Sequence, residues 1–395
     1  MAEEHKQMDS TEVTVRLRRR RKRHPVAKAI LAALALTAVF VFFTGAFSSY
    51  LLALGDLFDS VKIAVTQSGD FPVQTGINEV YQAQPLSGGF VALGQEDCVV
   101  VSSSGGLLRS IQAGYARPTL AVGRNRFVLY NRSGKELRIE NRTQTLYTQT
   151  MENNILTCAM SEKGTLAVAV DSNRYLAELS VYSSDLSTRK YLWQMTSTEG
   201  TPLCMAFAGD DRRLAVGTVT AKGGELVGSV YLLETNSDAV RWHVSSAGSV
   251  PLALIWQDNG HLLVLFDSFA AVYNQSGEEQ SRYEFGTRQL AAYSVEGKST
   301  ALLFSGETSG TVIVLNGSLK ETAEVMTPAA SGITLTGNAF YVICGFTVRQ
   351  YALNGTFVDS TDWEVRPQAV VNARKTVVLA GNNALLLDAA GDGNS

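Results

Sequence analysis

The chain has 395 residues, of which 45% are hydrophobic and 18% charged, and its formal net charge is -3. This composition excludes a largely disordered protein, because it supplies enough apolar material for an extensive core. The charge is unevenly spread: residues 1–25 hold eight Lys or Arg against four Asp or Glu, whereas the sequence after Lys28 sums to about -8. A basic segment ahead of an acidic body is typical of a chain oriented across a membrane.

The first predicted element is a transmembrane helix over residues 26–47, preceded by a basic tail at 1–25. The sequence from Ala29 to Phe47 contains no charge. As a helix it would extend roughly 28 Å, close to the ~30 Å hydrocarbon core of a bilayer. The run of Arg and Lys at 16–23 favours a cytoplasmic N-terminus. We therefore expect a single-pass protein of the cell membrane that contacts the lipid bilayer through Ala29 to Phe47. Residues 48–60 form its juxtamembrane stalk, and its C-terminal domain is extracytoplasmic.

Two other interpretations of the N-terminal segment are open. Thr44-Gly45-Ala46 resembles a weak signal-peptide cleavage site, although the basic region is longer than is usual for a signal peptide. The arginine run could also contact nucleic acid. The arginine run lies directly before an apolar span and is followed by an acidic domain. This arrangement favours a role in orienting the chain in the membrane, and we expect no nucleic-acid partner.

A short apolar strand then recurs along the body of the chain. Its eight occurrences begin at Phe90, Phe127, Leu166, Leu214, Leu262, Ala301, Phe340 and Val377. The intervals are 37, 39, 48, 48, 39, 39 and 37 residues. A repeat of about 40 residues is typical of propeller blades, in which loops vary while the structural unit does not.

Each repeat has a similar internal order. An apolar strand, such as residues 156–160, precedes the recurrent strand across a polar turn, and a third strand and a more polar fourth strand follow, such as 179–182 and 190–195. Turn pairs separate the third strand from the fourth and suit residues at positive φ. These pairs are Ser184-Asp185, Ser276-Gly277, Asn316-Gly317 and Asn354-Gly355. Four antiparallel strands per repeat predict a blade.

The last repeat has only three predicted strands, and a spare strand lies at residues 61–66. Propellers commonly close by letting one terminus complete the blade that the other begins, which removes exposed sheet edges. The sequence therefore predicts an all-β, eight-bladed β-propeller over residues 61–390, followed by a short tail at 391–395. A seven-bladed ring, a β-solenoid or stacked sandwiches are the alternatives.

The repeats at 161–170 and 209–216 resemble the turn-and-strand pattern of WD40-type and quinoprotein-type propellers, although no Trp-Asp pair ends the third strands. The whole layout resembles an uncharacterised family of membrane-anchored, propeller-like proteins from Gram-positive anaerobes. That resemblance implies a domain of unknown function with no established activity.

Chemical motifs are sparse. Trp193, Trp242 and Trp363 could belong to a quinoprotein, but packing between blades explains them better. His243 and His261 lack the spacing of metal ligands. Residues 388–392 are too sparse for a calcium loop. The cysteines, Cys98, Cys158, Cys204 and Cys344, are expected to be small buried hydrophobes. The acceptor patterns for N-glycosylation at Asn131, Asn141, Asn274, Asn316 and Asn354 are interpreted as turn chemistry.

We assign no catalytic, cofactor-binding or metal-binding residue, and we expect no cofactor. The leading hypothesis is a membrane-anchored binding or scaffolding module of the cell envelope whose ligand is a protein, peptide or glycan. The alternative is an extracytoplasmic enzyme, either a quinoprotein-like oxidoreductase or a glycan-acting enzyme. A sensor that signals through its tail ranks below both.

Overall fold

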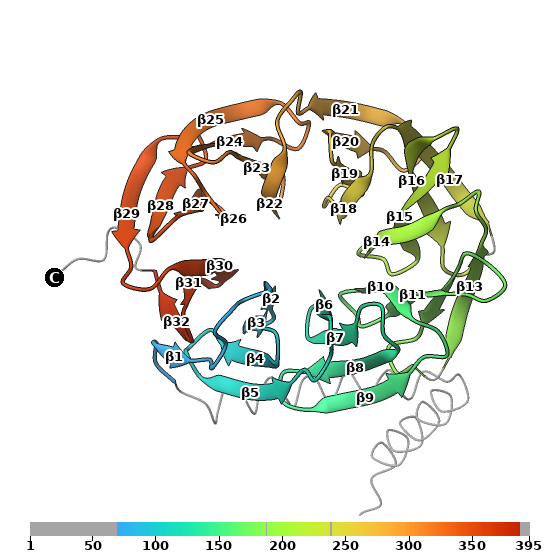
Figure 1. The fold of residues 1–395 in the computed structure, drawn as a ribbon, viewed down its shortest axis with the longest axis horizontal. Coiled ribbons are helices and arrows are strands. Elements are labelled where there is room, and N and C mark those ends of the chain that lie inside the picture. Colours follow the sequence, from blue (N-terminus) through green and yellow to red (C-terminus); the bar gives the residue numbers. More distant parts are fainter. Residues whose placement is uncertain (1–68, 187, 238, 388–395) are drawn as a thin grey trace, which may run out of the picture. The chain divides into compact units, whose positions relative to one another are not determined.

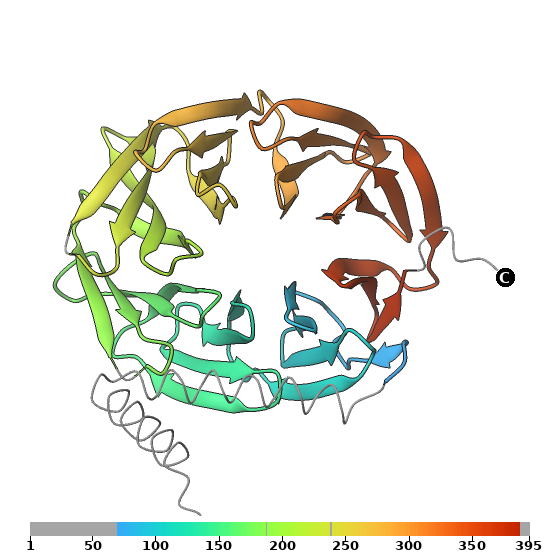
Figure 2. The same ribbon diagram turned by 180° about the vertical axis from the view of Figure 1, so that it is seen from behind.

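Thirty-two β-strands in eight antiparallel sheets of four make up the described part of the chain in the computed structural model, which describes residues 69–186, 188–237 and 239–387. All of these residues belong to one compact unit, Leu52–Ser395. The sheets are arranged radially around an axis, as Figures 1 and 2 show from opposite sides. The eight-bladed, all-β prediction is confirmed, and the seven-bladed ring, the solenoid and the stacked sandwiches are excluded.

The strands of each blade are named A to D from the axis outward, and the blades are numbered 1 to 8 in chain order. The A strands are β2 (Gln82–Leu86), β6 (Pro118–Val122), β10 (Ile155–Met160), β14 (Thr201–Phe207), β18 (Pro251–Trp256), β22 (Leu290–Glu296), β26 (Gly332–Leu335) and β30 (Pro367–Ala373). The B strands are β3 (Gly89–Leu93), β7 (Arg126–Asn131), β11 (Leu166–Asp171), β15 (Arg213–Lys222), β19 (Leu262–Phe266), β23 (Ser299–Ser305), β27 (Ala339–Cys344) and β31 (Lys375–Ala380).

The two outer positions complete the blades. The C strands are β4 (Asp97–Ser102), β8 (Glu136–Asn141), β12 (Ala177–Tyr182), β16 (Glu225–Glu234), β20 (Phe269–Tyr273), β24 (Ser309–Leu315), β28 (Thr347–Ala352) and β32 (Asn383–Leu386). The D strands are β5 (Leu107–Gln112), β9 (Thr145–Thr150), β13 (Arg189–Met195), β17 (Val240–Ala247), β21 (Glu279–Glu284), β25 (Glu321–Pro328), β29 (Phe357–Asp362) and, in blade 8, β1 (Val73–Gln74).

The recurrent apolar segment of the sequence is the B strand of every blade. A B strand lies inside its sheet, and the sheet is covered on both faces by the neighbouring blades. In β3, Phe90 and Ala92 pack toward blade 8, whereas Val91 and Leu93 pack toward blade 2. Because both faces are buried, both sets of alternating side chains are apolar, and the segment reads as a continuous hydrophobic run.

The core is divided into eight clusters, and each cluster fills the space between two adjacent blades. The D strands contribute less to them, because only one of their faces points inward. Buried and exposed residues therefore alternate along β25. This alternation explains why the fourth strand of each repeat is more polar in sequence.

The ring is closed by β1, which pairs antiparallel with β32 and so becomes the fourth strand of blade 8. Thr75 N donates to Asn382 O at 2.7 Å beside this pairing. A second link joins blade 8 to blade 1: Gln368 Oε1 accepts from Val80 N at 2.6 Å, and Gln368 Nε2 donates to Asn78 O at 2.7 Å. Closure by the N-terminal side is thus confirmed, but the closing strand is Val73–Gln74 in place of the predicted 61–66.

Positive φ occurs in the predicted C–D turns, but not always at the predicted residue. Gly277 and Gly355 have φ of 82° and 85°. In two other turns the left-handed residue is Leu186 or Leu319, both at 54°, and Asn316-Gly317 supplies a capping side chain instead. Asn316 Oδ1 accepts from Ser318 N at 2.9 Å.

The predicted tail, transmembrane helix, stalk and strand at 61–66 lie outside the described residues, as does the tail at 391–395. Within the ranges that the structure does describe, no helix is long and apolar enough to cross a membrane.

Candidate functional site

The antiparallel order of the strands gives the ring two different faces. The A–B and C–D turns of every blade lie at one face, called the AB face here. The B–C turns and the connections between blades lie at the other, called the BC face. Loops at the ends of rigid strands are where proteins of this kind commonly place binding residues.

A large concave site lies at the AB face and is called the mouth pocket. Its volume is about 960 Å³. Four consecutive A–B turns, from blades 2 to 5, surround it together with the adjoining ends of their A strands. The charged residues that line it are Arg124, Glu162, Asp210, Arg213 and Asp258. The mouth pocket therefore carries both signs of charge, contributed by four separate segments.

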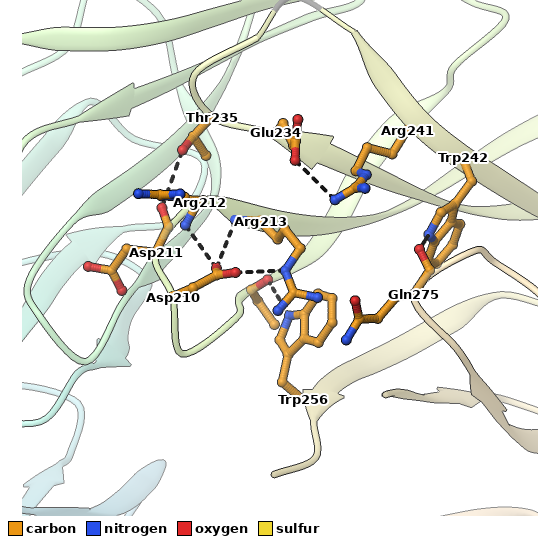
Figure 3. A network of polar contacts seen from close by, with 11 residues as sticks. Asp210, Asp211, Arg212, Arg213, Glu234, Thr235, Arg241, Trp242, Trp256 and Gln275 are labelled. Atoms are coloured by element: carbon orange, nitrogen blue, oxygen red, sulfur yellow. Dashed lines mark hydrogen bonds and ion pairs between the residues drawn. The ribbon is translucent and has the colours of Figure 1, made fainter. Parts of the chain in front are cut away.

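One wall of the mouth pocket is a fixed polar and aromatic unit (Figure 3). Asp210 Oδ2 accepts from Arg213 Nε at 2.8 Å, and the Arg213 guanidinium lies over the Trp256 ring at 5.1 Å. Trp256 Nε1 donates to Ala206 O at 3.0 Å, which joins blade 5 to blade 4. An arginine held between a carboxylate and an indole is positioned before any ligand arrives.

Two adjacent aspartates at this rim have opposite electrostatic environments. Burial opposes the ionisation of Asp210, but hydrogen bonds from Arg212 N and from Arg213 together lower its pKa below the usual value. Burial raises the pKa of Asp211. Among the described residues, Asp211 Oδ1 has no hydrogen-bond partner.

The outer part of the same rim is joined across blades 4 and 5. Trp242 Nε1 donates to Gln275 O at 3.1 Å, and a Cβ on Gly277 would meet Trp242 at 2.8 Å. Arg241 Nη1 lies 3.0 Å from Glu234 Oε1. Figure 3 shows the Trp242–Gln275 and Arg241–Glu234 contacts together with the Asp210–Arg213–Trp256 wall. The outer loops of blades 4 and 5 are therefore held in place by contacts within blade 4 and between the two blades.

A smaller site of about 320 Å³, called the arginine pocket here, adjoins the mouth pocket on the AB face. It is lined by the A–B turns of blades 8, 1 and 2, and Gly123 and Arg124 line both sites. The charged residues at its surface are Arg124 and Arg374. The two sites together follow the A–B turns of six of the eight blades.

The tryptophans weighed as quinoprotein features pack between blades, as expected. Trp193 of β13 meets Tyr231 of blade 4 edge to face, with ring centroids 5.2 Å apart. Trp242 of β17 packs beside Tyr273 of blade 5. Trp363 joins the cluster between blades 7 and 8. None of the three lines the mouth pocket.

The other sequence candidates are dispersed. His243 stacks on Tyr231, and His261 lies in the A–B turn of blade 5. The four cysteines are free, and burial raises the pKa of the Cys98 and Cys204 thiols to about 12. In the part of the chain that the structure describes, no three His, Cys, Asp or Glu side chains are grouped to hold a metal ion.

Four of the five asparagines at the glycosylation patterns serve turn geometry, whereas the Asn131 side chain bonds to Arg117, fourteen residues earlier in the chain. Each side-chain oxygen accepts a backbone N–H: Asn131 from Arg117, Asn141 from Thr143, Asn274 from Ser276, Asn316 from Ser318 and Asn354 from Thr356. Residues 388–392 lie outside the described part of the chain.

The pocket residues were missed by motif inspection, since Arg124, Arg213, Trp256 and Arg374 share no motif. A signal was nevertheless present. Each of these four residues lies in, or directly beside, the turn that precedes a recurrent B strand. Aligning the repeats on that strand would have placed all four on one rim.

Comparison with known structures shows the fold. The chain is similar to BamB from Moraxella catarrhalis, with 13% identity and a TM-score of 0.54 over 82% of this chain and 99% of that one. It is also similar to the computationally designed Ika8 protein, with 13% identity and a TM-score of 0.56 over 80% and 98% of the two chains. The C-terminal WD40 domain of Sif2 shares 11% identity and a TM-score of 0.55, over 79% and 99%. At these identities the likeness concerns architecture alone.

In sequence, no curated protein matches the chain. One family model does, and it covers residues 65–385, which include every strand of the ring except the last residue of β32. The chain therefore belongs to DUF5711, a family of unknown function.

Proposed function

We propose that this chain is a membrane-anchored, extracytoplasmic propeller that binds a ligand of the cell envelope on its AB face. The mouth pocket is the observation that carries the proposal. Turns from four blades converge on one concavity of about 960 Å³, a size within the usual range of ligand pockets. The module acts by capture or scaffolding.

The charges of the mouth pocket support binding, because several of them are available to a ligand. Arg124, Glu162 and Asp258 are exposed, and among the described residues their side chains have no hydrogen-bond or ion-pair partner. The turns that carry them are held at the ends of buried strands. Ordering such a surface on binding costs little conformational entropy, which favours affinity.

The membrane anchor rests on the sequence, namely the uncharged stretch from Ala29 to Phe47 behind a basic tail. Its orientation can be tested by cysteine labelling in intact cells with a membrane-impermeant maleimide. The native cysteines give little background, because burial raises their pKa and shields them. We expect Glu307→Cys to be labelled in intact cells and Ser10→Cys only after permeabilisation. The reverse pattern would overturn the proposed topology.

Binding at the AB face can be tested by charge reversal. Glu162→Lys with Asp258→Lys changes two exposed carboxylates of the mouth pocket. Glu307→Lys with Glu152→Lys makes the same change at two exposed residues of the BC face. Full-length variants are purified from envelopes after mild crosslinking. We expect the first pair to lose the partner that the wild type retains, and the second pair to keep it. Equal loss in both, or in neither, would count against the site.

A further inference from the structure

One sector of the AB face carries basic charge only in its turns. The charged residues of the described A–B and C–D turns in blades 8, 1 and 2 are all basic: Arg374 and Lys375 in blade 8, and Arg124, with Arg126 and Arg142 behind it, in blade 2. These three blades are neighbours in the ring (Figure 1). At blades 3, 4 and 5 the AB face carries both signs of charge: Glu162, Asp210 and Asp258 line the mouth pocket, and Lys163, Arg212 and Arg213 lie in or beside the same turns.

Two carboxylates lie toward the AB face at blades 1 and 2, those of Glu140 and Asp70, and neither pairs with the exposed arginines. Glu140, near the end of β8, is fully buried and is bound by Arg109 at 2.6 Å. Asp70 has its backbone against Gly105 in the outer C–D turn of blade 1, and it does not line the arginine pocket. Within the described ranges, the guanidinium groups of Arg124 and Arg374 have no hydrogen-bond or ion-pair partner.

Arg124 and Arg374 line the arginine pocket from either side of one turn. Arg124 comes from blade 2 and Arg374 from blade 8, and residues 85–89 of blade 1 lie between them. Arg374 has a φ of 67° at the tip of its turn. Ser87 N donates to Arg124 O at 2.9 Å, and Ser87 O accepts from Arg142 Nη1 at 3.0 Å. The backbone is therefore held at Ser87 and Arg124 by hydrogen bonds, and Arg374 is carried by the tight turn between two paired strands.

Exposed arginines on fixed backbone favour a carboxylate. Guanidinium groups recognise planar oxyanions through paired, charge-assisted hydrogen bonds. The arginine pocket shares Gly123 and Arg124 with the mouth pocket, so one ligand can occupy both. Such a ligand would meet two arginines first and a mixed surface with three acidic side chains next.

This order of charges argues for a peptide over an anionic glycan. A polymer with a negative charge in every repeat would be repelled by Glu162 and Asp258, while Arg213 is already paired with Asp210. A peptide can carry its charge at one end only. We infer that the AB face binds an extended peptide whose acidic end lies between Arg124 and Arg374, and whose neutral or basic residues follow the mouth pocket toward Trp256.

The inference rests on the proposed binding function and is tested by peptide selection on the immobilised full-length chain. Two synthetic decapeptide libraries are used, one with free and one with amidated C-termini, and bound peptides are identified by mass spectrometry. The wild type is expected to enrich peptides with acidic character at one end. Enrichment in the free library alone would assign the anion to the terminal carboxylate. Enrichment in both libraries would assign it to Asp or Glu side chains.

Charge reversal then locates the anion. Arg124→Glu with Arg374→Glu should weaken an enriched peptide roughly 10- to 100-fold, the usual range for charge-assisted hydrogen bonds. Lys298→Glu with Lys320→Glu makes the same change on the AB face at blade 6 and should alter affinity by less than about twofold, since both lysines lie away from the two pockets.

The outcomes separate the inference from the function on which it rests. If no peptide is enriched on any variant, peptide binding fails, and with it the inference. If peptides are enriched without an acidic end, or if acidic peptides bind the Arg124→Glu, Arg374→Glu variant unchanged, the binding function stands and the inference is wrong. Heparin is the glycan probe: tighter binding of heparin than of any enriched peptide, lost on the same reversal, would assign the arginines to a glycan.

Discussion

Asp210 and Asp211 are neighbours in sequence, yet folding shifts their pKa values in opposite directions. The difference comes from hydrogen bonding. Asp210 accepts three hydrogen bonds from Arg212 and Arg213, whereas one oxygen of Asp211 is buried without a described partner. A single turn thus contains one carboxylate that stabilises the fold when ionised and one that destabilises it.

The pair predicts opposite effects of pH on two matched variants. Because folding lowers the pKa of Asp210, its stabilising effect is present at neutral pH and is lost as pH falls. Because folding raises the pKa of Asp211, its cost appears as pH rises through the usual aspartate pKa of about 3.9. We expect Asp210→Asn to be less stable than the wild type at pH 7 and Asp211→Asn to be more stable, with both differences shrinking toward pH 3. Urea denaturation between these pH values measures this, and shifts of the same sign would contradict it.

Leu319 combines a left-handed backbone with a buried side chain, 3% exposed at a φ of 54°. Truncation should cost about 2–5 kcal/mol of unfolding free energy. Left-handed φ costs a residue with a Cβ about 1–2 kcal/mol, more than the roughly 0.5–1 kcal/mol entropy cost of glycine. Leu319→Gly should therefore be more stable than Leu319→Ala. At Leu315, in the same cluster but within β24, the order should be the usual one, with alanine the more stable. The same order at both sites would contradict this account.

Two Arg–Glu pairs of equal length predict different energies. Arg109–Glu140 and Arg282–Glu279 both have 2.6 Å contacts, but Glu140 is fully buried while Glu279 is 35% exposed. We expect Glu140→Gln to lower the unfolding free energy by roughly 1.5–3 kcal/mol, because it weakens a buried charge-assisted hydrogen bond. Glu279→Gln should cost less than about 1 kcal/mol. Equal costs would show that burial does not determine the strength of these pairs.

At the scale of the element, the weakest point of the ring is the strand that closes it. Its ladder joins only Val73 and Gln74 to β32, and the hydrogen bonds of Thr75 and Gly76 to Asn382 O and the two side-chain hydrogen bonds of Gln368 complete the closure. Gln368→Ala removes two of these hydrogen bonds and should cost about 2 kcal/mol. Hydrogen exchange should then accelerate at β1 and β32. Gln82→Ala removes a similar bond to Leu120 within the continuous chain and should leave β1 protected. Equal exchange at β1 in the two variants would contradict this prediction.

The elements also explain what could be predicted from the sequence. B strands are buried on both faces, so they have apolar residues at successive positions and can be recognised even though the loops between them differ in length. The eight apolar runs therefore predict both the number of blades and the order of their strands. The closing strand is only two residues long and carries no such pattern, which is why the longer apolar segment at 61–66 was the better candidate by sequence. Leu186 and Leu319 were missed at positive φ, because packing in the core overrides the usual preference for glycine.

In the molecule as a whole, the candidate site forms only when the ring of blades is closed. Arg124 and Arg374 are 250 positions apart in the sequence, and only the completed ring brings them to one pocket. Their proximity depends on the pairing of β1 with β32 and on the packing of blade 8 against blade 1. A short sequence motif cannot predict such a site, because its residues are far apart in the sequence. The positions of these residues within the aligned repeats can predict it.

We propose that ligand binding is confined to the AB face. Photo-crosslinking in intact cells tests it most directly, with a photoreactive residue placed at Glu162 or Asp258 on the AB face and at Glu307 or Glu152 on the BC face. We expect discrete adducts from the first two positions and none from the second two. Adducts of equal yield from both faces, or from the BC face alone, would contradict it.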